Sequence, residues 1–190
     1  MVGIFFKRTF DIAFSIIVIL ALAPFWIIIP ILIKIDSPGR IFFIQQRVGK
    51  DSELFNMYKF RSMKEGTVDL PAEKMQDHKS QYTRIGGLLR RFSLDELPQL
   101  FNILKGDMSV VGPRPSHLGQ TDQIALRKKL GTDRVKPGLT GLAQVSGRDA
   151  ITVEEKSEYD KRYVFEHRPF MDLVIILKTI PVVLSFKGGN

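Results

Sequence analysis

Two adjacent carboxylates, Asp95 and Glu96, stand near the middle of a 190-residue chain whose net charge is +8. An ionised aspartate can attack phosphorus and form an aspartyl phosphate, which is a known form of covalent catalysis. Arginine suits bidentate contacts with phosphate; Arg90 precedes the pair, and Arg114 follows it between two prolines. These residue types therefore allow chemistry on a phosphorylated substrate. The simpler alternative is that the acidic pair only caps a helix.

The same stretch predicts where a helix begins. Ser93-x-x-Glu96 matches a capping box, which would start the helix at Ser93. That register would place Pro98 inside the helix, where its ring and its missing N–H destabilise the turn. If Asp95 is the N-cap instead, Pro98 falls in the first turn, whose N–H groups have no partner within the helix. We therefore expect Asp95 at or just before a helix N-terminus, which attracts anions and keeps a carboxylate ionised.

The composition excludes several classes of protein. A content of 44% hydrophobic residues argues against a disordered chain, and the absence of cysteine excludes disulfides and thiolate zinc sites. The histidines, His78, His117 and His167, lack the spacing of a zinc motif, so we assign no metal or base role to them. A pI near 9.8 indicates an anionic partner. No nucleic-acid-binding motif is visible, so we do not expect nucleic acid to be that partner.

Further basic residues and glycine-containing loops are candidates for binding phosphates. Lys59 and Arg61 alternate on a predicted strand, and residues 138–141 and 146–148 could form phosphate-binding loops that include Thr140 and Arg148. Neither loop is a GxGxxG or Walker A motif, so no ATP-type site is indicated. The alternative for these cations is a solvated basic face that contacts lipid headgroups.

Residues 12–33 form an apolar run without a charged side chain, about as long as a membrane-spanning helix requires. One interpretation is a signal peptide, with Lys7 and Arg8 before its apolar region, but the run stays apolar past the cleavage-like residues 21–23. A second is a straight transmembrane helix. Proline at position 24 would break such a helix, as would the proline at position 30, and positive charges flank both ends of the run.

A re-entrant helix is the third interpretation and the one we favour. It would enter the membrane, bend at Pro24 and return to the same face, so that both positive flanks and both termini are cytoplasmic. We expect residues 1–35 to form this hairpin, with Lys7 and Arg8 at the membrane surface, and residues 36–190 to form one cytoplasmic, interfacial catalytic domain. The remaining alternative is a buried core helix of a soluble protein.

The rest of the chain predicts a mainly helical α+β fold. Residues 41–48 and 53–63 alternate as the strands of a small β-hairpin. Amphipathic or charged helices are predicted at 83–92, 96–106, 152–168 and in the second part of 114–131. Residues 64–82 and 135–149 are predicted as loops, the first with short helices as an alternative. The apolar segment 170–186 contains Asp172, Lys178 and Pro181, so we expect it to be interfacial or core. Amphipathic interfacial helices would thus surround the site.

Taken in order, the motifs resemble those of the bacterial sugar transferase family, the monotopic phosphoglycosyl transferases. The matching stretches cover nearly the whole chain: "KRTFD", "DSPGRIFFIQQRVG", "YKFRSM", "TRIGGLLRRFSLDELPQLFNILKGDMSVVGPRP", "KPGLTGLAQVSGR" and "DLVIILKTI". As a set they are specific to this family. The chain resembles its minimal catalytic form, without the additional N-terminal membrane domain of longer members. The resemblance implies a protein on the cytoplasmic face of the bacterial inner membrane.

The resemblance also implies an activity and its partners. Such enzymes move a sugar-1-phosphate from a UDP-sugar to polyprenol phosphate and release UMP, as the first membrane step of surface glycan synthesis. Asp95 matches the nucleophile of a ping-pong reaction, and Glu96 matches its partner, which is associated with Mg²⁺. Membrane lipids and later glycosyltransferases are further implied partners. The expected substrate-binding residues are Lys59, Arg61, Arg90, Gln99, Pro113, Arg114, Pro115, Thr140, Gln144, Arg148 and Asp160.

Two positions depart from the family pattern. Ala23 stands where a serine often precedes the helix-breaking proline, so another group must satisfy the carbonyl that the break frees. Arg40 replaces a proline in the "DSPG" turn and could add a headgroup contact. The sequence does not specify the sugar; residues 70–82 and 147–152 are where we look for specificity. The alternative functions are a non-catalytic basic lipid-binding protein and a soluble nucleic-acid binder.

Overall fold

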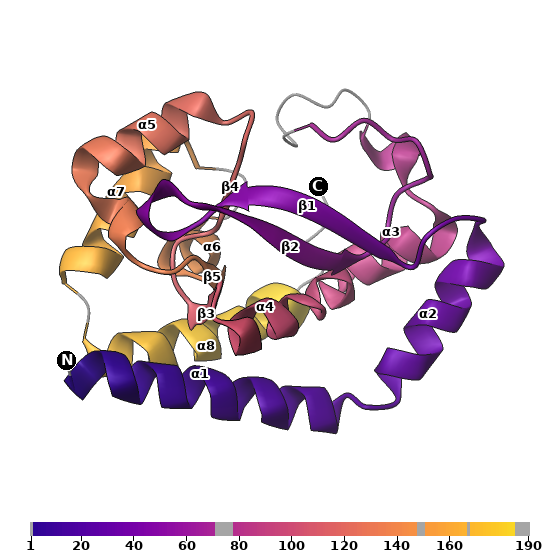
Figure 1. Cartoon of the computed structure of the whole chain (residues 1–190), viewed down its shortest axis with the longest axis horizontal. Helices are drawn as coiled ribbons and strands as arrows, with labels where there is room; N and C mark the ends of the chain where they lie inside the picture. Colours follow the sequence, from indigo (N-terminus) through magenta and orange to yellow (C-terminus); the bar gives the residue numbers. More distant parts are fainter. Residues whose placement is uncertain (1, 71–77, 148–150, 167, 185–190) are drawn as a thin grey trace.

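The computed structural model describes residues 2–70, 78–147, 151–166 and 168–184, and it confirms a mainly helical α+β chain (Figure 1). The helices of more than four residues are α1 Val2–Ala21, α2 Phe25–Asp36, α3 Arg84–Arg91, α4 Gln99–Lys105, α5 Thr121–Leu130, α6 Leu142–Ser146, α7 Val153–Phe165 and α8 Pro169–Leu184. The strands are β1 Phe42–Val48, β2 Leu54–Phe60, β3 Ser109–Val111, β4 Ser116–His117 and β5 Gly138–Thr140.

The chain bends sharply between α1 and α2, at the predicted proline. The two helices meet at an angle of 64°, and α1 forms one edge of the molecule in Figure 1 while α2 rises away from its end. Pro24 is the N-cap of α2. Among the described residues, no single helix is long and apolar enough to cross a membrane, whereas the bent pair passes that test when its two halves are taken together. The predicted second break at Pro30 is wrong, because α2 continues through it.

Backbone turns satisfy the carbonyls at the break. The N–H of Ala23 donates to the carbonyl of Leu20 at 3.2 Å, and the N–H of Phe25 donates to Leu22 at 2.9 Å. The N–H of Trp26 reaches the carbonyl of Ala23 at 3.2 Å. These bonds between residues three apart tighten the chain at the end of one helix and the start of the next. The structure therefore explains how the chain bends without the serine that Ala23 replaces.

The predicted β-hairpin is confirmed. β1 and β2 pair antiparallel from Phe42 opposite Phe60 to Val48 opposite Leu54, and β4 adds two residues to the other edge of β1. The turn between β1 and β2 contains Asp51 in the left-handed conformation, with φ 53°. The hairpin crosses above α4 in Figure 1. Strand β2 packs against α4 and against the turn Leu94–Glu96, which contains Asp95.

A second, parallel pair of short strands was not predicted. β3 and β5 pair with Ser109 opposite Gly138 and Val111 opposite Thr140. The prediction of a loop over residues 135–149 is therefore wrong, because β5 and α6 both fall within it. A Cβ on Gly138 would lie 2.1 Å from the backbone N of Gly112, so only glycine allows the two chains to approach this closely.

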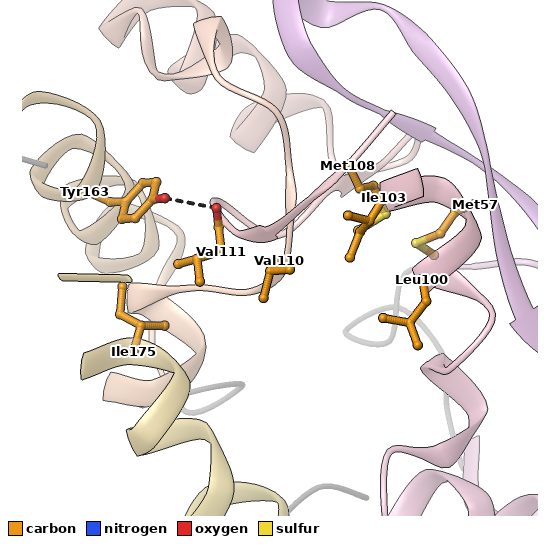
Figure 2. Close-up of a cluster of buried hydrophobic side chains, with 8 residues drawn as sticks. All are labelled: Met57, Leu100, Ile103, Met108, Val110, Val111, Tyr163 and Ile175. Carbon is orange, nitrogen blue, oxygen red and sulfur yellow. Dashed lines mark hydrogen bonds between the residues drawn. The ribbon is translucent and has the colours of Figure 1, made fainter. Parts of the chain in front are cut away.

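The main core lies between β3, α4, α7 and α8. Its buried side chains surround Val110 and Val111, and Tyr163 of α7 donates its hydroxyl to the carbonyl of Val111 at 2.9 Å (Figure 2). A second cluster joins α2 to α3 through Ile29, Ile33, Phe60 and Leu89. Trp26 and Leu97 pack against both clusters. The start of α2 is thus fixed to the rest of the protein.

Large apolar side chains remain exposed on three helices. They include Phe5, Phe6, Ile17 and Leu20 of α1, Ile27, Ile31 and Ile35 of α2, and Phe170, Leu173, Leu177 and Ile180 of α8. In Figure 1, α1 and α8 lie along the same edge of the molecule. An exposed apolar surface of this extent marks a site of contact with a membrane or another protein.

Candidate active site

The predicted catalytic pair lies in a cavity of about 1460 Å³. Asp95 and Glu96 line it together with three of the predicted cations, Lys59, Arg90 and Arg114. The lining also includes apolar side chains from α1, from the bend after it and from α8, namely Phe14, Val18, Leu22, Ile176, Ile180 and Val183. One cavity therefore offers a charged region and an apolar region side by side.

The backbone around Asp95 differs from the predicted N-cap. Ser93 adopts the left-handed conformation with φ 55°, and residues Leu94–Glu96 form a single 3₁₀ turn before α4. Pro98 itself is the N-cap of α4, and neither Ser93 nor Pro98 makes a side-chain cap. The prediction that Asp95 lies just before a helix is confirmed, whereas the capping-box and Asp95 N-cap registers are wrong. Left-handed backbone at a non-glycine residue costs about 1 kcal/mol, which is typical of functional turns.

Glu96 connects two of the cations. Its Oε1 accepts hydrogen bonds from Nζ of Lys59 and from Nη2 of Arg114, each at 2.9 Å. Burial by itself would raise the pKa of Glu96, but Arg114 and Lys59 together hold that pKa well below its usual range. Glu96 is therefore ionised at neutral pH and sets the positions of a strand residue and a loop residue in the cavity.

Asp95 is the more deeply buried carboxylate, with 4% of its surface exposed. Burial raises its pKa and the neighbouring Glu96 adds to the rise, while Lys59, Arg90 and Arg114 oppose it without cancelling it. This direction is opposite to the expectation that a helix terminus would keep Asp95 readily ionised. A buried carboxylate of raised pKa beside cations is a common feature of catalytic sites.

Arg90 and Lys59 reach the cavity from different elements. Arg90 is in the last turn of α3, where its guanidinium lies 4.7 Å from the centre of the Tyr82 ring. This cation–π contact fixes the arginine beside Asp95. Lys59 is half-buried in β2, and desolvation is the main cause of its lowered pKa. The structure thus brings together the strand, helix and loop cations that the sequence proposed separately.

Asp160 lines the cavity, but its carboxylate is engaged with a residue that the sequence analysis did not select. Oδ2 of Asp160 accepts from Nε and Nη2 of Arg127 at 2.9 and 2.6 Å, and both residues are buried. Nη1 of Arg127 donates to the carbonyl of Arg114 at 2.7 Å and to Oγ of Ser116 at 2.8 Å. Asp160 and Arg127 therefore hold the loop that carries Arg114. In the sequence, Arg127 was one of several basic residues on a helix, with no signal that it was buried.

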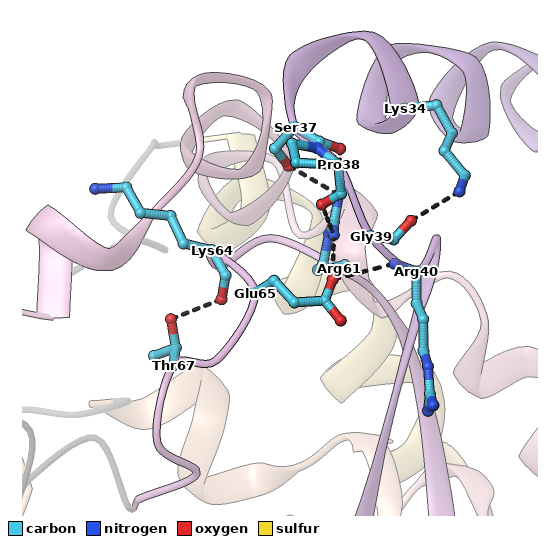
Figure 3. A network of polar contacts seen from close by, with 9 residues as sticks. All are labelled: Lys34, Ser37, Pro38, Gly39, Arg40, Arg61, Lys64, Glu65 and Thr67. Carbon is cyan, nitrogen blue, oxygen red and sulfur yellow. Dashed lines mark hydrogen bonds and ion pairs between the residues drawn. The ribbon is translucent and has the colours of Figure 1, made fainter.

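Arg61 has a different environment from the other predicted cations. Its guanidinium donates to the carbonyls of Ser37 and Pro38 and to the carboxylate of Glu65 (Figure 3). The Glu65 carboxylate also accepts from the backbone N–H of Arg40. These contacts connect the turn after α2 to the end of β2, although Arg61 also lines the cavity.

The remaining predicted residues are spread around the cavity. Pro115, Thr140 and Gln144 line it, and Oγ1 of Thr140 shares a hydrogen bond of 2.7 Å with Thr179. Gln99 is the first residue of α4 and Pro113 lies between β3 and β4, and neither lines this cavity. Arg148 lies outside the described residues, as do residues 71–77 and 148–150 of the segments considered for sugar specificity.

The basic residues expected at the membrane make internal contacts. Arg8 donates to the carbonyls of Ile103 and Leu104, which end α4. A cation at that position complements the dipole of the helix. Nζ of Lys7 pairs with Oδ2 of Asp172 in α8 at 2.7 Å. Arg8 and Lys7 therefore attach α1 to α4 and α8.

The carboxylate pair fits the donor set of a magnesium site that is shared with substrate. Mg²⁺ in nucleotide enzymes uses one or two carboxylates together with substrate phosphates. Asp95 and Glu96 supply two carboxylates in the cavity. Among the described residues there is no cluster of three or more His, Cys, Asp or Glu side chains that could hold a metal.

Asp95, which is buried, and Glu96, which is half-buried, thus lie among cations in a cavity whose lining also includes apolar side chains. Residues 2–186 match the model of the bacterial sugar transferase family, and the chain belongs to that family.

Three relatives illustrate this membership. The chain is 39% identical over 191 residues to the UDP-N-acetylgalactosamine-undecaprenyl-phosphate N-acetylgalactosaminephosphotransferase of Aeromonas hydrophila, covering 98% of the chain and 45% of the relative. It is 36% identical over 200 residues to the exopolysaccharide production protein ExoY of Sinorhizobium fredii, covering 96% and 87%. It is 40% identical over 186 residues to the undecaprenyl-phosphate glucose phosphotransferase of Komagataeibacter xylinus, covering 92% and 35%. The chain thus spans less than half of two relatives and most of the third.

Proposed function

We propose that the chain is a phosphoglycosyl transferase, which moves a sugar-1-phosphate from a UDP-sugar to polyprenol phosphate and releases UMP. The observation that carries this proposal is the position of Asp95, buried in a cavity beside Lys59, Arg90 and Arg114. Three cations suit the diphosphate of a nucleotide sugar. The names of the Aeromonas and Komagataeibacter relatives include undecaprenyl phosphate, and the apolar part of the cavity lining suits such a lipid.

The proposed reaction has two displacements at the same phosphorus. An oxygen of the Asp95 carboxylate attacks the β-phosphorus, the bond from that phosphorus to the bridging oxygen breaks, and UMP leaves with the electron pair. The phosphate of polyprenol phosphate then attacks the phosphosugar on Asp95, and the aspartyl oxygen leaves as a carboxylate. Arg90 and Arg114 orient the phosphate oxygens and oppose their charge. Mg²⁺, when held by Glu96 and the diphosphate, would neutralise further charge.

The bent helix pair supports a position at the membrane surface. In this proposal α1 and α2 enter one leaflet and return to the same face, and the exposed apolar side chains of α8 lie at the interface. The cytoplasmic leaflet is anionic and would attract a protein of net charge +8. The cavity would then open where a soluble nucleotide sugar can meet a lipid phosphate at the cytoplasmic face of the inner membrane.

The proposal is tested by measuring UMP release from a panel of UDP-sugars in detergent or nanodiscs, with and without polyprenol phosphate. The expected result is release by the wild type and loss of release in Asp95→Asn. Asp51→Asn is the matched control, because Asp51 is in the hairpin turn and does not line the cavity. Lipid binding without UMP release from any UDP-sugar would instead favour a non-catalytic lipid-binding protein.

A further inference from the structure

A second polar cluster lines the same cavity, on the wall formed by the sheet. It consists of Gln45 in β1, Asp69 in the segment after β2, and His117 in β4. Nε2 of Gln45 and Nε2 of His117 both contact Oδ1 of Asp69, the second at 3.2 Å. These three residues take no part in the two displacements at phosphorus. Three elements that are distant in sequence thus converge on one carboxylate.

The orientation of Gln45 is fixed by its neighbour on the same face of β1. Arg47 donates to Oε1 of Gln45 from Nε at 2.8 Å and from Nη2 at 2.6 Å. The amide oxygen must therefore face the guanidinium, because the reverse orientation would place the amide NH₂ donor of Gln45 against the N–H donors of Arg47. The amide NH₂ of Gln45 is left to face Asp69 and donates to it.

The orientation of His117 is fixed in the same way. The backbone N–H of Gly119 donates to Nδ1 at 2.9 Å, so that nitrogen carries no proton. In the neutral ring the proton is then on Nε2, which donates to Asp69. Two oriented donors therefore hold one oxygen of the Asp69 carboxylate. The Asp69 side chain nevertheless keeps 44% of its surface exposed, compared with 10% for His117.

The cluster is close to the catalytic cations but differs from them in charge. Gln45 lies opposite Met57, two residues before Lys59 on β2. Such diagonal neighbours are about 7–8 Å apart in an antiparallel pair. Arg47 is near enough to contribute to the lowered pKa of Lys59, after the larger effect of burial. A ligand group bound by Asp69 would thus lie near a phosphate that contacts Lys59.

The charge of Asp69 selects the kind of group that it can bind. A carboxylate repels phosphate and accepts hydrogen bonds from hydroxyl or N–H donors. We propose that Asp69, held by Gln45 and His117, recognises hydroxyl groups of the sugar in the UDP-sugar and determines which sugar is transferred. Asp69 is the specificity residue, and Gln45 and His117 are positioning residues. This inference rests on the proposed transferase function.

The test compares kcat/KM for UMP release across UDP-hexoses and UDP-N-acetylhexosamines that differ at single hydroxyl positions. Asp69→Asn is nearly isosteric and is expected to lower kcat/KM for the preferred donor about 10- to 100-fold, the effect of one hydrogen bond to a charged group. Its discrimination between epimers is expected to shrink by a similar factor. Binding of UMP is expected to change less than about twofold, because the sugar is absent from it. Asp51→Asn is the carboxylate control outside the cavity.

A second variant guards against a folding defect. Gln45→Met keeps the length of the side chain but removes the donor to Asp69, and it is expected to reduce discrimination between epimers while thermal melting confirms the fold. An active Asp69→Asn with unchanged sugar preference would overturn the inference and leave the proposed function intact. Weakening of UMP binding by the same factor would also overturn it, because Asp69 would then contact the nucleotide. A wild type that releases UMP from no donor would overturn the proposed function itself.

Discussion

Asp95 combines two opposing influences on its charge. Burial and Glu96 favour the protonated acid, whereas Lys59, Arg90 and Arg114 favour the carboxylate. Since the pKa is raised overall, the carboxylate is less stable here than in water, and a less stable anion is a better nucleophile once a substrate phosphate approaches. The pKa of Asp95 is raised, whereas the pKa of Glu96 is lowered. This difference separates the role of Asp95 as the nucleophile from the role of Glu96 as a permanently charged partner.

The first prediction concerns the pH dependence of the reaction. Attack requires ionised Asp95, so kcat/KM should fall as the pH falls through the raised pKa of this group, above the range in which an ordinary aspartate titrates. Lys59 is the largest of the influences that lower this pKa. Lys59→Met should therefore move the acid limb of the pH–rate profile to higher pH.

Lys105→Met is the control for that experiment. Lys105 is an exposed lysine paired with Asp107, and it does not line the cavity. It should leave the profile unchanged. An acid limb that stays in place, or moves to lower pH, in active Lys59→Met would show that the profile reports another group.

The second prediction concerns stability. An acid whose pKa is raised by folding binds its proton more tightly in the native state, so its ionisation destabilises the fold as the pH rises through that pKa. Asp95→Asn removes this cost and should raise the melting temperature at neutral pH. The difference from wild type should disappear below the pKa of an ordinary carboxylate. A folded Asp95→Asn that melts below wild type at neutral pH would contradict the electrostatic account.

At the scale of the elements, the pair between α5 and α7 supports the loop that carries Arg114. Removing Arg127 alone leaves the buried carboxylate of Asp160 without its partner, which costs about 3–5 kcal/mol. Arg127→Met should therefore strongly lower the free energy of unfolding. The double variant Arg127→Met/Asp160→Leu removes both charges and should regain most of that stability, measured by urea unfolding.

The activity of the double variant shows whether the pair also positions Arg114 for catalysis or only stabilises the fold. The double variant still lacks the donor to the carbonyl of Arg114, so it should remain impaired in UMP release although it is stable. Restoration of full activity together with stability would show that the pair only stabilises the core.

Helix α3 offers a matched comparison between two adjacent glycines. A Cβ on Gly86 would lie 1.9 Å from the backbone oxygen of Ser62, whereas one on Gly87 would meet nothing within 4 Å. Gly86→Ala should cost about 2 kcal/mol or more and displace α3, which carries Arg90. Gly87→Ala should stabilise the helix by about 0.5–1 kcal/mol. Thermal melting of the two variants distinguishes them, and equal effects would refute the close packing of α3 on Ser62.

Residue alternation and turn residues predicted the elements whose structure depends mainly on nearby residues in the sequence. The alternation of residues 41–63 predicted the hairpin, and α4 ends at Gly106, the last residue of the predicted helix 96–106, with φ 101°. The β3–β5 pair was missed because each strand has only three residues and its partner is distant in sequence. Arg127 was missed for a related reason, since its partner Asp160 lies 33 residues away. Residue type and spacing pointed to the acidic pair and its cations, and family motifs assigned their roles. The Gln45–Asp69–His117 cluster exists only once three distant segments are assembled.

The N-terminal helix pair, α1 and α2, is attached to the rest of the described chain through both of its helices. Arg8 and Asp11 bind α1 to α4 and β3, since Oδ1 of Asp11 accepts from the N–H of Val110 at 2.9 Å. Ile29 and Ile33 pack α2 against Phe60 and Leu89. The break at Pro24 was predictable from the sequence, but the angle and these attachments were not, because they depend on the packing of the domain.

The chain contains no cysteine, which makes the topology directly testable. Single cysteines at Phe6 and at Arg40, both exposed positions on either side of the bend, should be labelled from the same side of the membrane. Glu158→Cys, on the exposed face of α7, is the reference for the catalytic side. Labelling of Phe6→Cys and Arg40→Cys from opposite sides would refute the re-entrant arrangement and require a spanning helix.

The covalent intermediate is the most direct test of the role proposed for Asp95. The purified protein would be incubated with a UDP-sugar that supports UMP release, in the absence of polyprenol phosphate, and analysed by intact-mass and peptide mass spectrometry. The account predicts one phosphosugar per chain, located on the peptide that contains Asp95, removed by polyprenol phosphate and absent from Asp95→Asn. UMP release that requires polyprenol phosphate and leaves no adduct on the wild type, or an adduct that persists in Asp95→Asn, would contradict it.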